Sequence, residues 1–256
     1  MVCMKRPTLA VCLTIYEREE AVLRKMFDSL LPQKFDQLVV VLDRSSAKTD
    51  NFVRSYLFKE DRAEIVSIAG KPGWLCPARA WNEAFSRVRT ELVYCFSSET
   101  VQREGNVAHA AEQLAGVPAI LFGKAECGPE CPGEVKWTDG APGSLLCDSK
   151  HPRPLGFIWA GPMWAIRAIR GYDENFMRGH WYDDDDFFYR VWSLGIPFVF
   201  TDDIYGLHLH HERGELNEDS IRRNLDYYIE KYGKLGATAI TPSKTDREPG
   251  KTVWRR

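Results

Sequence analysis

The densest group of reactive side chains is the segment HWYDDDDFFYR, residues 180–190, in which four consecutive aspartates stand between aromatic residues. Carboxylates act as general bases toward attacking hydroxyls, and they also bind divalent ions. An amphipathic surface helix spreads its acids apart, and a disordered acidic tail does not flank them with Trp181 and Phe187. If the run begins a helix, the positive end of the helix dipole stabilises the acids, and the helical turn distributes them around the axis. The run therefore predicts a site in which only some of the aspartates face one pocket.

A second group of candidate ligands follows in GLHLHHER, residues 206–213. In an extended chain His208 and His210 share one face, and His211 points to the other. Imidazole suits transition-metal ions, so these three histidines are candidate metal ligands. A surface cluster without a metal is the alternative.

A third set of ligands lies in the Gly-, Pro- and Cys-rich segment 126–156, which we expect to be a loop-rich insertion. Cys127-x3-Cys131 is followed there by Cys147-x3-His151. Two pairs of such ligands in a stretch poor in core residues are compatible with a structural Zn²⁺ site. The spacing is not one of the commonest zinc patterns, and unrelated thiols in an insertion are the alternative.

Composition restricts the class of protein. The 256 residues are 44% hydrophobic, which is enough for the core of one large α/β domain or two small ones. A formal net charge of −2 gives no global field toward nucleic acid or an anionic membrane. The longest apolar runs are far shorter than a bilayer span, so we expect no integral membrane segment. Seven cysteines, several of them single in apolar stretches, predict a reduced, cytoplasmic protein.

Strands and helices alternate in the predicted secondary structure. From apolar runs and helical periodicity we predict strands at 8–16, 37–43, 63–69, 91–99, 118–125 and 157–167, one or two short strands within 196–212, and helices at 17–31, 51–60, 76–89 and 217–235. Such alternation indicates a parallel sheet covered on both faces. The polar, proline-containing residues 236–256 are predicted to be a flexible C-terminal tail.

Polar side chains fall where the predicted strands end, namely at Tyr16-Glu17, at Asp43 and at Ser97-Ser98-Glu99. In an open α/β sheet, ligands bind at the carboxyl ends of the strands. These three strand ends therefore predict a ligand site at one edge of the sheet.

Six segments in order resemble the motifs of GT-A fold glycosyltransferases, of the large family-2 type of inverting enzymes. They are LAVCLTIYERE, VVVLDRSSAKTD, PARAWNEAF, YCFSSET, WAGPMWAIRAIRGYDENF and DDDDFFYRVWSLG, and the resemblance runs from about residue 8 to about residue 217. It implies an α/β fold of the GT-A (Rossmann-like) type, with a mixed, mainly parallel sheet flanked by helices. It also implies a single catalytic domain at 6–235.

The resemblance implies a metal-dependent transferase that uses a nucleotide-diphospho sugar, with UDP as the expected nucleotide. The leaving diphosphate needs a divalent ion or cations to neutralise it, and Mn²⁺ or Mg²⁺ is expected. By analogy Glu99 is a metal ligand together with a histidine, and His208 and His211 best match the spacing in relatives. Two departures stand out: Arg44 follows Asp43 where relatives have a second acid, and Ser97-Ser98-Glu99 retains only the last acid of D-x-D.

Donor contacts are also implied by the motifs. Asp43 resembles the acid that binds the edge of the nucleobase. Arg79 offers donors to the diphosphate, and Asn82 orients nearby loops or the donor sugar. The full donor-binding set implied in this way is Thr14, Tyr16, Glu17, Asp43, Arg79, Asn82 and Ser98.

The acidic run takes its register from Arg190, the closing arginine of the motif E-D-x-D-L-x-x-R. This register places Asp184 as the general base that deprotonates the acceptor hydroxyl, with Asp183 as the next candidate. Asp186 or Asp185 is then expected to pair with Arg190 or to cap local backbone, and Asp185 to face solvent. The expected acceptor-binding residues are Trp159, Gly161, Trp181 and Tyr182.

The acceptor itself is left open: a glycan, a small molecule, or a modified nucleic acid such as a modified nucleobase in phage DNA. A non-catalytic nucleotide-sugar binding module is the first alternative, and the weakened D-x-D motif supports it. A nucleotidyltransferase is the second, although the first strand–helix turn lacks a glycine-rich, basic phosphate loop.

Overall fold

The computed structural model describes residues 6–70, 73–128, 145–209, 211, 217–233, 240 and 242–256. The strands are β1 (Leu9–Ile15), β2 (Gln37–Asp43), β3 (Ala63–Ile68), β4 (Leu92–Phe96), β5 (Thr100–Gln102), β6 (Ile120–Cys127), β7 (Leu145–Cys147), β8 (Ile158–Pro162), β9 (Phe198–His208), β10 (Lys244–Glu248) and β11 (Lys251–Arg255). The helices are α1 (Glu20–Leu30), α2 (Ala47–Tyr56), α3 (Ala78–Arg87), α4 (Asn106–Gln113), α5 (Met163–Ala168), the 3₁₀ helix η1 (Glu174–Arg178), α6 (Asp183–Ser193) and α7 (Glu218–Tyr232).

Within the described residues the strands form one mixed sheet in the order β10-β11-β9-β6-β8-β4-β1-β2-β3, with β5 paired to β9 and β7 to β6. Strands β3, β2, β1 and β4 are parallel neighbours, whereas β8 is antiparallel to both β4 and β6. The predicted fold class, a mixed sheet flanked by helices, is confirmed.

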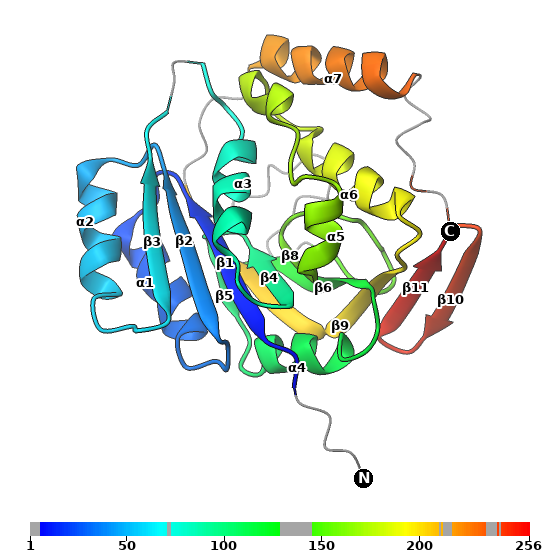
Figure 1. Cartoon of the computed structure of the whole chain (residues 1–256), viewed down its shortest axis with the longest axis horizontal. Helices are drawn as coiled ribbons and strands as arrows, with labels where there is room; N and C mark the ends of the chain where they lie inside the picture. Colours follow the sequence, from blue (N-terminus) through cyan, green and yellow to red (C-terminus); the bar gives the residue numbers. More distant parts are fainter. Residues whose placement is uncertain are drawn as a thin grey trace.

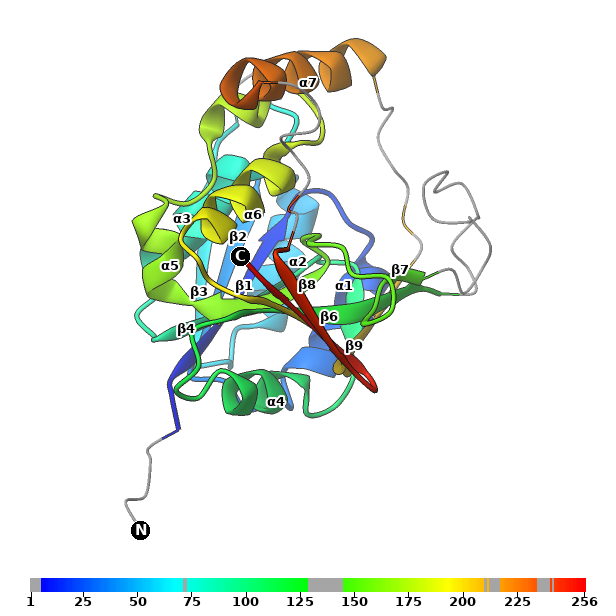
Figure 2. The same cartoon turned by 90° about the vertical axis from the view of Figure 1, so that its right-hand side faces the viewer.

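Helices cover both faces of this sheet, and a separate apolar core lies on each face (Figure 2). One core joins β1 and β2 to α1, α2 and α4, and the other joins the opposite sides of these strands to α3, α5 and α6. All seven residues of β2 are buried, as expected for a central parallel strand. Helix α7 lies across the carboxyl end of the sheet, beyond α3 and α6 (Figure 1).

Helix α2 begins four residues before its predicted start, at Ala47 rather than at residue 51. Ser46 is its N-cap, and the Ser46 hydroxyl accepts from the Thr49 N–H at 3.4 Å. The Glu17 carboxylate in turn accepts from the Ser46 and Thr49 hydroxyls at 3.1 and 3.0 Å. The helix start is therefore set by a residue 29 positions away along the chain, which local periodicity does not reveal.

The predicted strand at 157–167 ends at Pro162 and continues as α5. Pro162 lies opposite Leu92, the first residue of β4, so a longer β8 would have no partner on that side. The chain turns into a helix instead, because unpaired backbone groups are costly. Elements β5 and α4 lie in a stretch for which the sequence predicts none.

The prediction of a flexible tail at 236–256 is wrong for residues 244–255, which form the hairpin β10–β11 at the edge of the sheet (Figure 1). Strand β11 pairs antiparallel with β9, from Lys251 opposite Thr201 to Trp254 opposite Phe198. The Thr252 hydroxyl is buried and donates to the Ser149 carbonyl at 2.6 Å. Polar composition suits this strand because it lies near the sheet edge, where side chains remain partly exposed.

Replacing Trp254 with alanine is expected to lower the free energy of unfolding by about 2 kcal/mol, roughly half the cost of removing a fully buried aromatic ring. The Trp254 ring is half-buried and lies 4.8 Å from the ring of Phe200, centroid to centroid. Urea denaturation measures the change. Arg255→Ala on the same strand is the control, since its exposed pairing with Asp246 contributes little. Equal stability of both variants would contradict the docking of β11.

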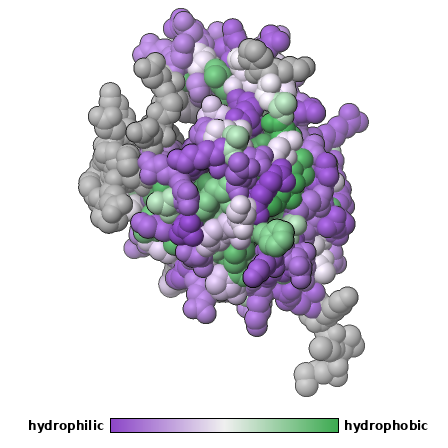
Figure 3. Space-filling model, turned by 90° about the vertical axis from the view of Figure 1, so that its left-hand side faces the viewer, coloured by the Kyte–Doolittle hydropathy of each residue, from purple (hydrophilic) through white to green (hydrophobic). Residues whose placement is uncertain are grey.

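The surface beside α2 and β3 carries separate hydrophobic areas among hydrophilic side chains (Figure 3). Phe58, just after α2, is 84% exposed. Scattered apolar side chains are ordinary on a folded surface, so we assign no function to these hydrophobic areas. No helix within the described residues combines the length and apolar character needed to cross a bilayer.

Candidate functional site

The three predicted metal ligands, Glu99, His208 and His211, lie together at the carboxyl end of the sheet. Glu99 stands between β4 and β5, and His208 is the last residue of β9. The antiparallel pairing of β5 with β9 places Thr100 opposite His208, and the Leu209 N–H donates to the Glu99 carbonyl at 2.8 Å. This pairing joins residues that are more than a hundred positions apart. His210 lies outside the described residues.

The geometry of this cluster fits a divalent cation. One ligand atom from each residue lies within 4.8 Å of the others. The Glu99 Oε1 atom is 3.3 Å from His208 Nε2 and 3.6 Å from His211 Nε2. Two ligands of one ion stand roughly 3 Å apart when each bond is about 2.1 Å long. One carboxylate and two imidazoles are a donor set that transition-metal ions accept.

Glu99 is held in its ionised form. Burial by itself would raise the pKa of Glu99, but the hydrogen bond with His208 and the charges of Arg18 and His211 hold it well below its ordinary value. The Arg18 Nε atom donates to Glu99 Oε2 at 2.9 Å, and the Ser98 hydroxyl donates to the same oxygen at 3.0 Å. An ionised carboxylate is the form that binds a metal.

Arg18 is a site residue that the sequence reasoning missed. It follows the end of β1 and donates to Glu99 and to the Glu17 carbonyl, the latter at 2.6 Å. Its only sequence signal is a cation just after the opening strand. Its position provides a positive charge beside the metal cluster, where an anionic ligand would need one.

A pocket of ≈ 420 Å³ adjoins the cluster. Its lining comes from the end of β1, from α1 and α2, and from the cluster itself: Tyr16, Glu17, Arg18, Glu19, Glu20, Leu23, Lys48, Thr49, Phe52 and His211. The volume lies in the range of small-molecule sites. Arg18 and His211 belong to both the pocket and the surroundings of Glu99, so the two features are continuous.

Several predicted donor-binding residues already have protein partners. Thr14 is half-buried within β1, Glu17 caps α2, and Ser98 holds Glu99. Arg44 donates to both carboxylate oxygens of Asp43 at 2.8 Å, and its guanidinium lies 5.0 Å from the centre of the Tyr16 ring. The group at this strand end is therefore an ion pair, where the motif predicts a free carboxylate.

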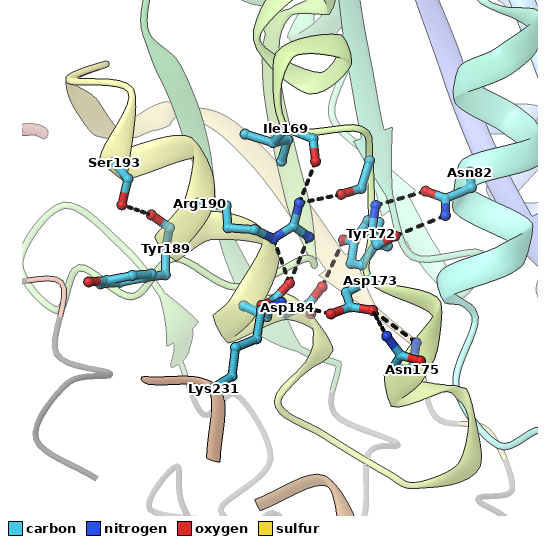
Figure 4. Close-up of polar contacts among 12 residues, drawn as sticks. Asn82, Ile169, Tyr172, Asp173, Asn175, Asp184, Tyr189, Arg190, Ser193 and Lys231 are labelled. Carbon is cyan, nitrogen blue, oxygen red and sulfur yellow. Dashed lines mark hydrogen bonds and ion pairs between the residues drawn. The ribbon is translucent and has the colours of Figure 1, made fainter. Parts of the chain in front are cut away.

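Asn82 orients a loop, which was one of its two predicted roles. Its side chain accepts from the Tyr172 N–H at 2.7 Å and donates to the Tyr172 carbonyl at 3.0 Å. It also donates to Glu174, as does the half-exposed Arg79 at 3.2 Å. Asn82 thus holds Tyr172, as Figure 4 shows, and Asn82 and Arg79 together hold Glu174 at the start of η1.

The four aspartates form the first turn of α6 and face four different surroundings. Asp186 is fully buried and pairs with Arg190, as expected, and also with Lys231 of α7. Asp185 is exposed to solvent, as expected. Asp183 and Asp184 remain as the pair turned toward β8 and the start of α3, where Gly156 and Cys76 lie against them.

Burial and mutual repulsion change the acidity of this pair. Burial, and then the charge of Asp184, raise the pKa of Asp183 to about 7. Burial also raises the pKa of Asp184, while hydrogen bonds from the Tyr172 hydroxyl and the Gly156 backbone oppose the increase. The Cys76 thiol is hydrogen-bonded to Asp183, and burial together with that carboxylate raises the pKa of the thiol well above its ordinary value. A carboxylate with a raised pKa is a stronger base near neutral pH.

Gly156 and Phe157 lie between two groups: the pair Asp183 and Asp184, and the candidate metal site formed by Glu99, His208 and His211. An added Cβ at position 156 would lie 2.8 Å from Asp184 Oδ2, so a larger residue there would displace the Asp184 carboxylate. The next residue, Phe157, places its ring edge-on to the His208 ring at 5.6 Å and accepts from the Ser97 N–H. Two chemically different groups, a carboxylate pair and a cation-binding cluster, therefore lie on either side of a two-residue segment.

Two of the predicted acceptor-binding residues need correction. Trp159 is 1% exposed and packs between Phe187 and Phe188 in the core, so it offers no surface to an acceptor. Gly161 is buried in β8, where an added Cβ would lie 2.4 Å from Ile120. These two residues lie within β8, whose register with β4 and β6 turns them inward.

Trp181 and Tyr182, the other two predicted acceptor-binding residues, immediately precede α6. Both adopt left-handed backbone conformations, with φ of 67° and 64°. Asn224 of α7 donates to the Trp181 carbonyl at 2.9 Å and supports this conformation. The Trp181 side chain is 42% exposed and lies two residues before Asp183 in the chain.

The residues of the predicted Zn²⁺ site do not assemble within the described part of the chain. Cys127 and Cys147 are buried thiols on β6 and β7, and Cys147 donates to the Arg153 carbonyl at 3.2 Å. The exposed His151 contacts Asp148 instead, and Cys131 lies outside the described residues. Among described residues the metal-binding geometry is found at Glu99 and its two histidines.

Solved structures of glycosyltransferases share this fold. A mannosyltransferase, PcManGT from Pyrobaculum calidifontis, in complex with GDP-Man and Mn²⁺ has 13% identity and a TM-score of 0.61, covering 93% of this chain and 79% of its own. GalNAc-T7 with UDP, GalNAc and Mn²⁺ has 10% identity and a TM-score of 0.64, with 91% and 49% covered. S. aureus TarS, residues 1–349, has 16% identity and a TM-score of 0.55, with 81% and 59% covered. This chain thus spans about half of GalNAc-T7. No curated protein sequence matches it.

The family is established by a sequence model. The model described as glycosyl transferase family 2 matches residues 10–139, just over half of the 256 residues. The matched region holds the parallel strands β1 to β4 and also Glu99, which lies at the carboxyl end of the sheet. The chain therefore belongs to glycosyl transferase family 2 and is a glycosyltransferase with a GT-A fold.

Proposed function

We propose that this glycosyltransferase moves a sugar from a nucleotide-diphospho sugar to an acceptor hydroxyl with inversion, and that it requires a divalent metal. The observation that carries the proposal is the juxtaposition of two groups across Gly156 and Phe157. Asp184 lies against one end of this segment, and His208 of the cation cluster contacts the other. Such an arrangement suits a reaction that needs a base on one side and charge neutralisation on the other.

Glu99, His208 and His211 would hold the metal. A bound divalent ion supplies positive charge against the diphosphate of the donor. Two imidazoles favour Mn²⁺ over Mg²⁺, which prefers a shell of oxygen atoms. Arg18 already ion-pairs with Glu99 and adds a second positive charge at the mouth of the adjoining pocket. The same residue orients the Glu99 carboxylate, so that one oxygen remains directed at the histidines.

Asp184 is the base in this proposal. Its carboxylate takes the proton of the acceptor hydroxyl as that oxygen attacks the anomeric carbon, and the nucleoside diphosphate leaves from the opposite side. One base acting in one displacement inverts the configuration at that carbon. Asp183 is less suited, because its side chain is buried and hydrogen-bonded to the Cys76 thiol, whereas Asp184 is only partly buried.

For the donor we propose the pocket next to Arg18 and His211, with UDP as the first nucleotide to test. PcManGT was solved with GDP-Man and GalNAc-T7 with UDP, so guanosine and uridine donors both belong in the panel. The Asp43–Arg44 ion pair presents guanidinium donors as well as carboxylate acceptors at the strand end. For the acceptor we propose a hydroxyl-bearing glycan, small molecule or modified nucleobase that contacts Trp181.

Replacing His208 with alanine is expected to weaken activation by Mn²⁺ by at least about 100-fold, because even indirect partners of a metal ligand contribute 10–100-fold to affinity. The assay measures nucleoside diphosphate release from UDP-glucose, UDP-GalNAc and GDP-mannose over a range of MnCl₂. His151→Ala is the control, since His151 is exposed and contacts only Asp148 among its described partners.

A thermal-shift series on the same proteins separates binding from catalysis. If a nucleotide sugar stabilises the wild-type chain but no nucleoside diphosphate is released with any donor, a non-catalytic binding module is favoured over a transferase. The reduction of the D-x-D motif to Glu99 alone is the observation that supports that alternative. Mn²⁺-independent release in the wild-type protein would contradict the metal requirement.

A further inference from the structure

Tyr172 touches the proposed base from a position that leaves it little freedom. Its side chain is 3% exposed, and its ring stacks on Phe187 with centroids 4.2 Å apart and planes 11° from parallel. Its hydroxyl donates to Asp184 Oδ1 at 2.8 Å. Asp184 and Phe187 lie three residues apart on α6, a spacing that puts both on one side of a helix. Tyr172 thus lies along α6 and contacts both residues.

The backbone of Tyr172 is fixed as firmly as its ring. The Asn82 side chain accepts from the Tyr172 N–H and donates to the Tyr172 carbonyl, so one side chain holds both sides of the residue (Figure 4). The preceding Gly171 has a φ of 71°, and an added Cβ there would lie 2.2 Å from Asn82 Oδ1. Arg190 donates to the carbonyls of Ile169 and Gly171 at 2.7 Å each. The segment before η1 is therefore held by α3 and α6 together.

The hydroxyl of Tyr172 is not needed for the packing of its ring. A phenylalanine would keep the stacking on Phe187 and lose only the contact with Asp184. The hydroxyl is a polar group in a fully apolar ring stack, and its partner is the proposed base.

We propose that Tyr172 is a positioning residue for the proposed base: its hydroxyl holds Asp184 Oδ1 and so sets the orientation in which the carboxylate meets the acceptor hydroxyl. This inference rests on the proposed role of Asp184. Gly156 approaches the same carboxylate closely: an added Cβ there would lie 2.8 Å from Oδ2, and the Gly156 backbone is hydrogen-bonded to Asp184. A carboxylate held at one oxygen does not rotate freely, and a base must be oriented toward the proton that it removes.

The charged and polar groups around Asp184 determine, together with the Tyr172 hydroxyl, the pKa of the Asp184 carboxyl. Asp183 and Asp185 are its acidic neighbours on α6, and the Cys76 thiol beside α3 is hydrogen-bonded to Asp183. Tyr172 comes from the segment before η1, and Gly156 contributes a backbone N–H. Burial and the Asp184 charge raise the pKa of Tyr172 well above its ordinary value, so the phenol stays protonated and remains a donor.

Tyr172→Phe tests the inference with two measurements. The first is ¹³C NMR titration of labelled aspartate carboxyls in the free protein, with the Asp184 signal assigned through Asp184→Asn. The loss of a hydrogen bond to the ionised form should move the Asp184 midpoint to higher pH. The second is the pH dependence of kcat/KM for nucleoside diphosphate release. Hydrogen bonds to charged groups contribute about 1.5–3 kcal/mol, so the variant should be roughly tenfold slower or more at pH values below the acidic midpoint. Above that midpoint it should remain slower than wild type, because a carboxylate that is no longer held is less often oriented toward the acceptor hydroxyl.

Tyr94→Phe is the matched control. Tyr94 is buried in β4, and its hydroxyl donates to Gln102 at 2.6 Å, away from the aspartates. It should change stability without moving either pH profile. An unchanged Asp184 midpoint in Tyr172→Phe, or a wild-type rate above the acidic midpoint, would overturn the positioning role. Full turnover in Asp184→Asn would instead refute the proposed base, and with it the catalytic meaning of Tyr172, even if the NMR midpoint moves.

Discussion

Replacing Asp184 with asparagine is expected to slow glycosyl transfer by roughly 10²–10⁴-fold, the usual contribution of a positioned general base. The substitution keeps the size of the side chain and can still accept from the Tyr172 hydroxyl, whose ring remains stacked on Phe187. It removes the negative oxygen that takes the proton. Donor affinity should be nearly unchanged, because Arg18 and His211 lie on the other side of the Gly156–Phe157 segment.

The pH profile gives a second sign of the same role. Burial raises the pKa of Asp184, so wild-type activity should fall at a pH above the ordinary range of aspartate as the carboxylate becomes protonated. This acidic limb should disappear from the residual activity of Asp184→Asn. Steady-state kinetics from pH 4 to 9, with nucleotide binding measured in parallel, tests both statements.

Asp185→Asn is the matched control for this experiment, since Asp185 follows Asp184 on α6 and faces solvent. Its kcat should stay within about threefold of wild type, as expected for an exposed surface substitution. If Asp185→Asn were the inactive variant and Asp184→Asn the active one, the register fixed by Arg190 would be shifted by one residue. If neither lost activity, the base would lie outside the run.

Replacing Asp186 with asparagine is expected to lower the free energy of unfolding by about 3–5 kcal/mol, the cost of leaving buried cations without their partner. Asp186 is 0% exposed. Arg190 donates to its Oδ2 atom at 2.7 Å, and Lys231 and the Tyr232 hydroxyl both donate to its Oδ1 atom at 2.5 Å. An amide has the same shape but cannot neutralise Arg190 and Lys231 together.

The same change should also loosen two neighbours of the site. Lys231 and Tyr232 belong to α7, which supports Trp181 through Asn224. Arg190 holds the carbonyls just before Tyr172. We therefore expect faster amide hydrogen exchange in α7 and around residue 171, together with a lower urea midpoint. Asp185→Asn again serves as the control, and a loss below about 1 kcal/mol for Asp186→Asn would show that α7 is held by its apolar contacts instead.

The positions of β1 to β4 and of β6 were predictable from the sequence, and so was the order of the motifs. Buried runs such as QLVVVLD define β2 at both ends, because a strand covered on both faces must be apolar throughout. The start of α2 was not predictable, since Glu17 contributes to its cap from another element. The C-terminal hairpin was missed because its residues are polar, and only β9 beside them makes a strand favourable.

At the candidate site, the resemblance to family-2 motifs pointed to Glu99, His208 and His211 as metal ligands, and the fold brings these three residues together. Arg18 and Tyr172 were not recognisable, because arginine and tyrosine are common everywhere and acquire a role here only through their partners. Trp159 was misjudged for the converse reason, since a tryptophan near a site in sequence can point into the core.

The sequence by itself determined the family, the alternation of strands and helices, and the presence of four acids on one helical turn. These properties depend on residue type and on spacing over short stretches of the chain. Each such stretch carries that information by itself, without its neighbours in the fold. The tertiary structure decided how the acids divide, because the direction of each side chain around α6 has meaning only when its surroundings are in place. Asp186 meets two cations, Asp185 meets solvent, and Asp184 meets Tyr172. Burial and hydrogen bonding at each position, rather than the identical side chains, give the four aspartates their different roles.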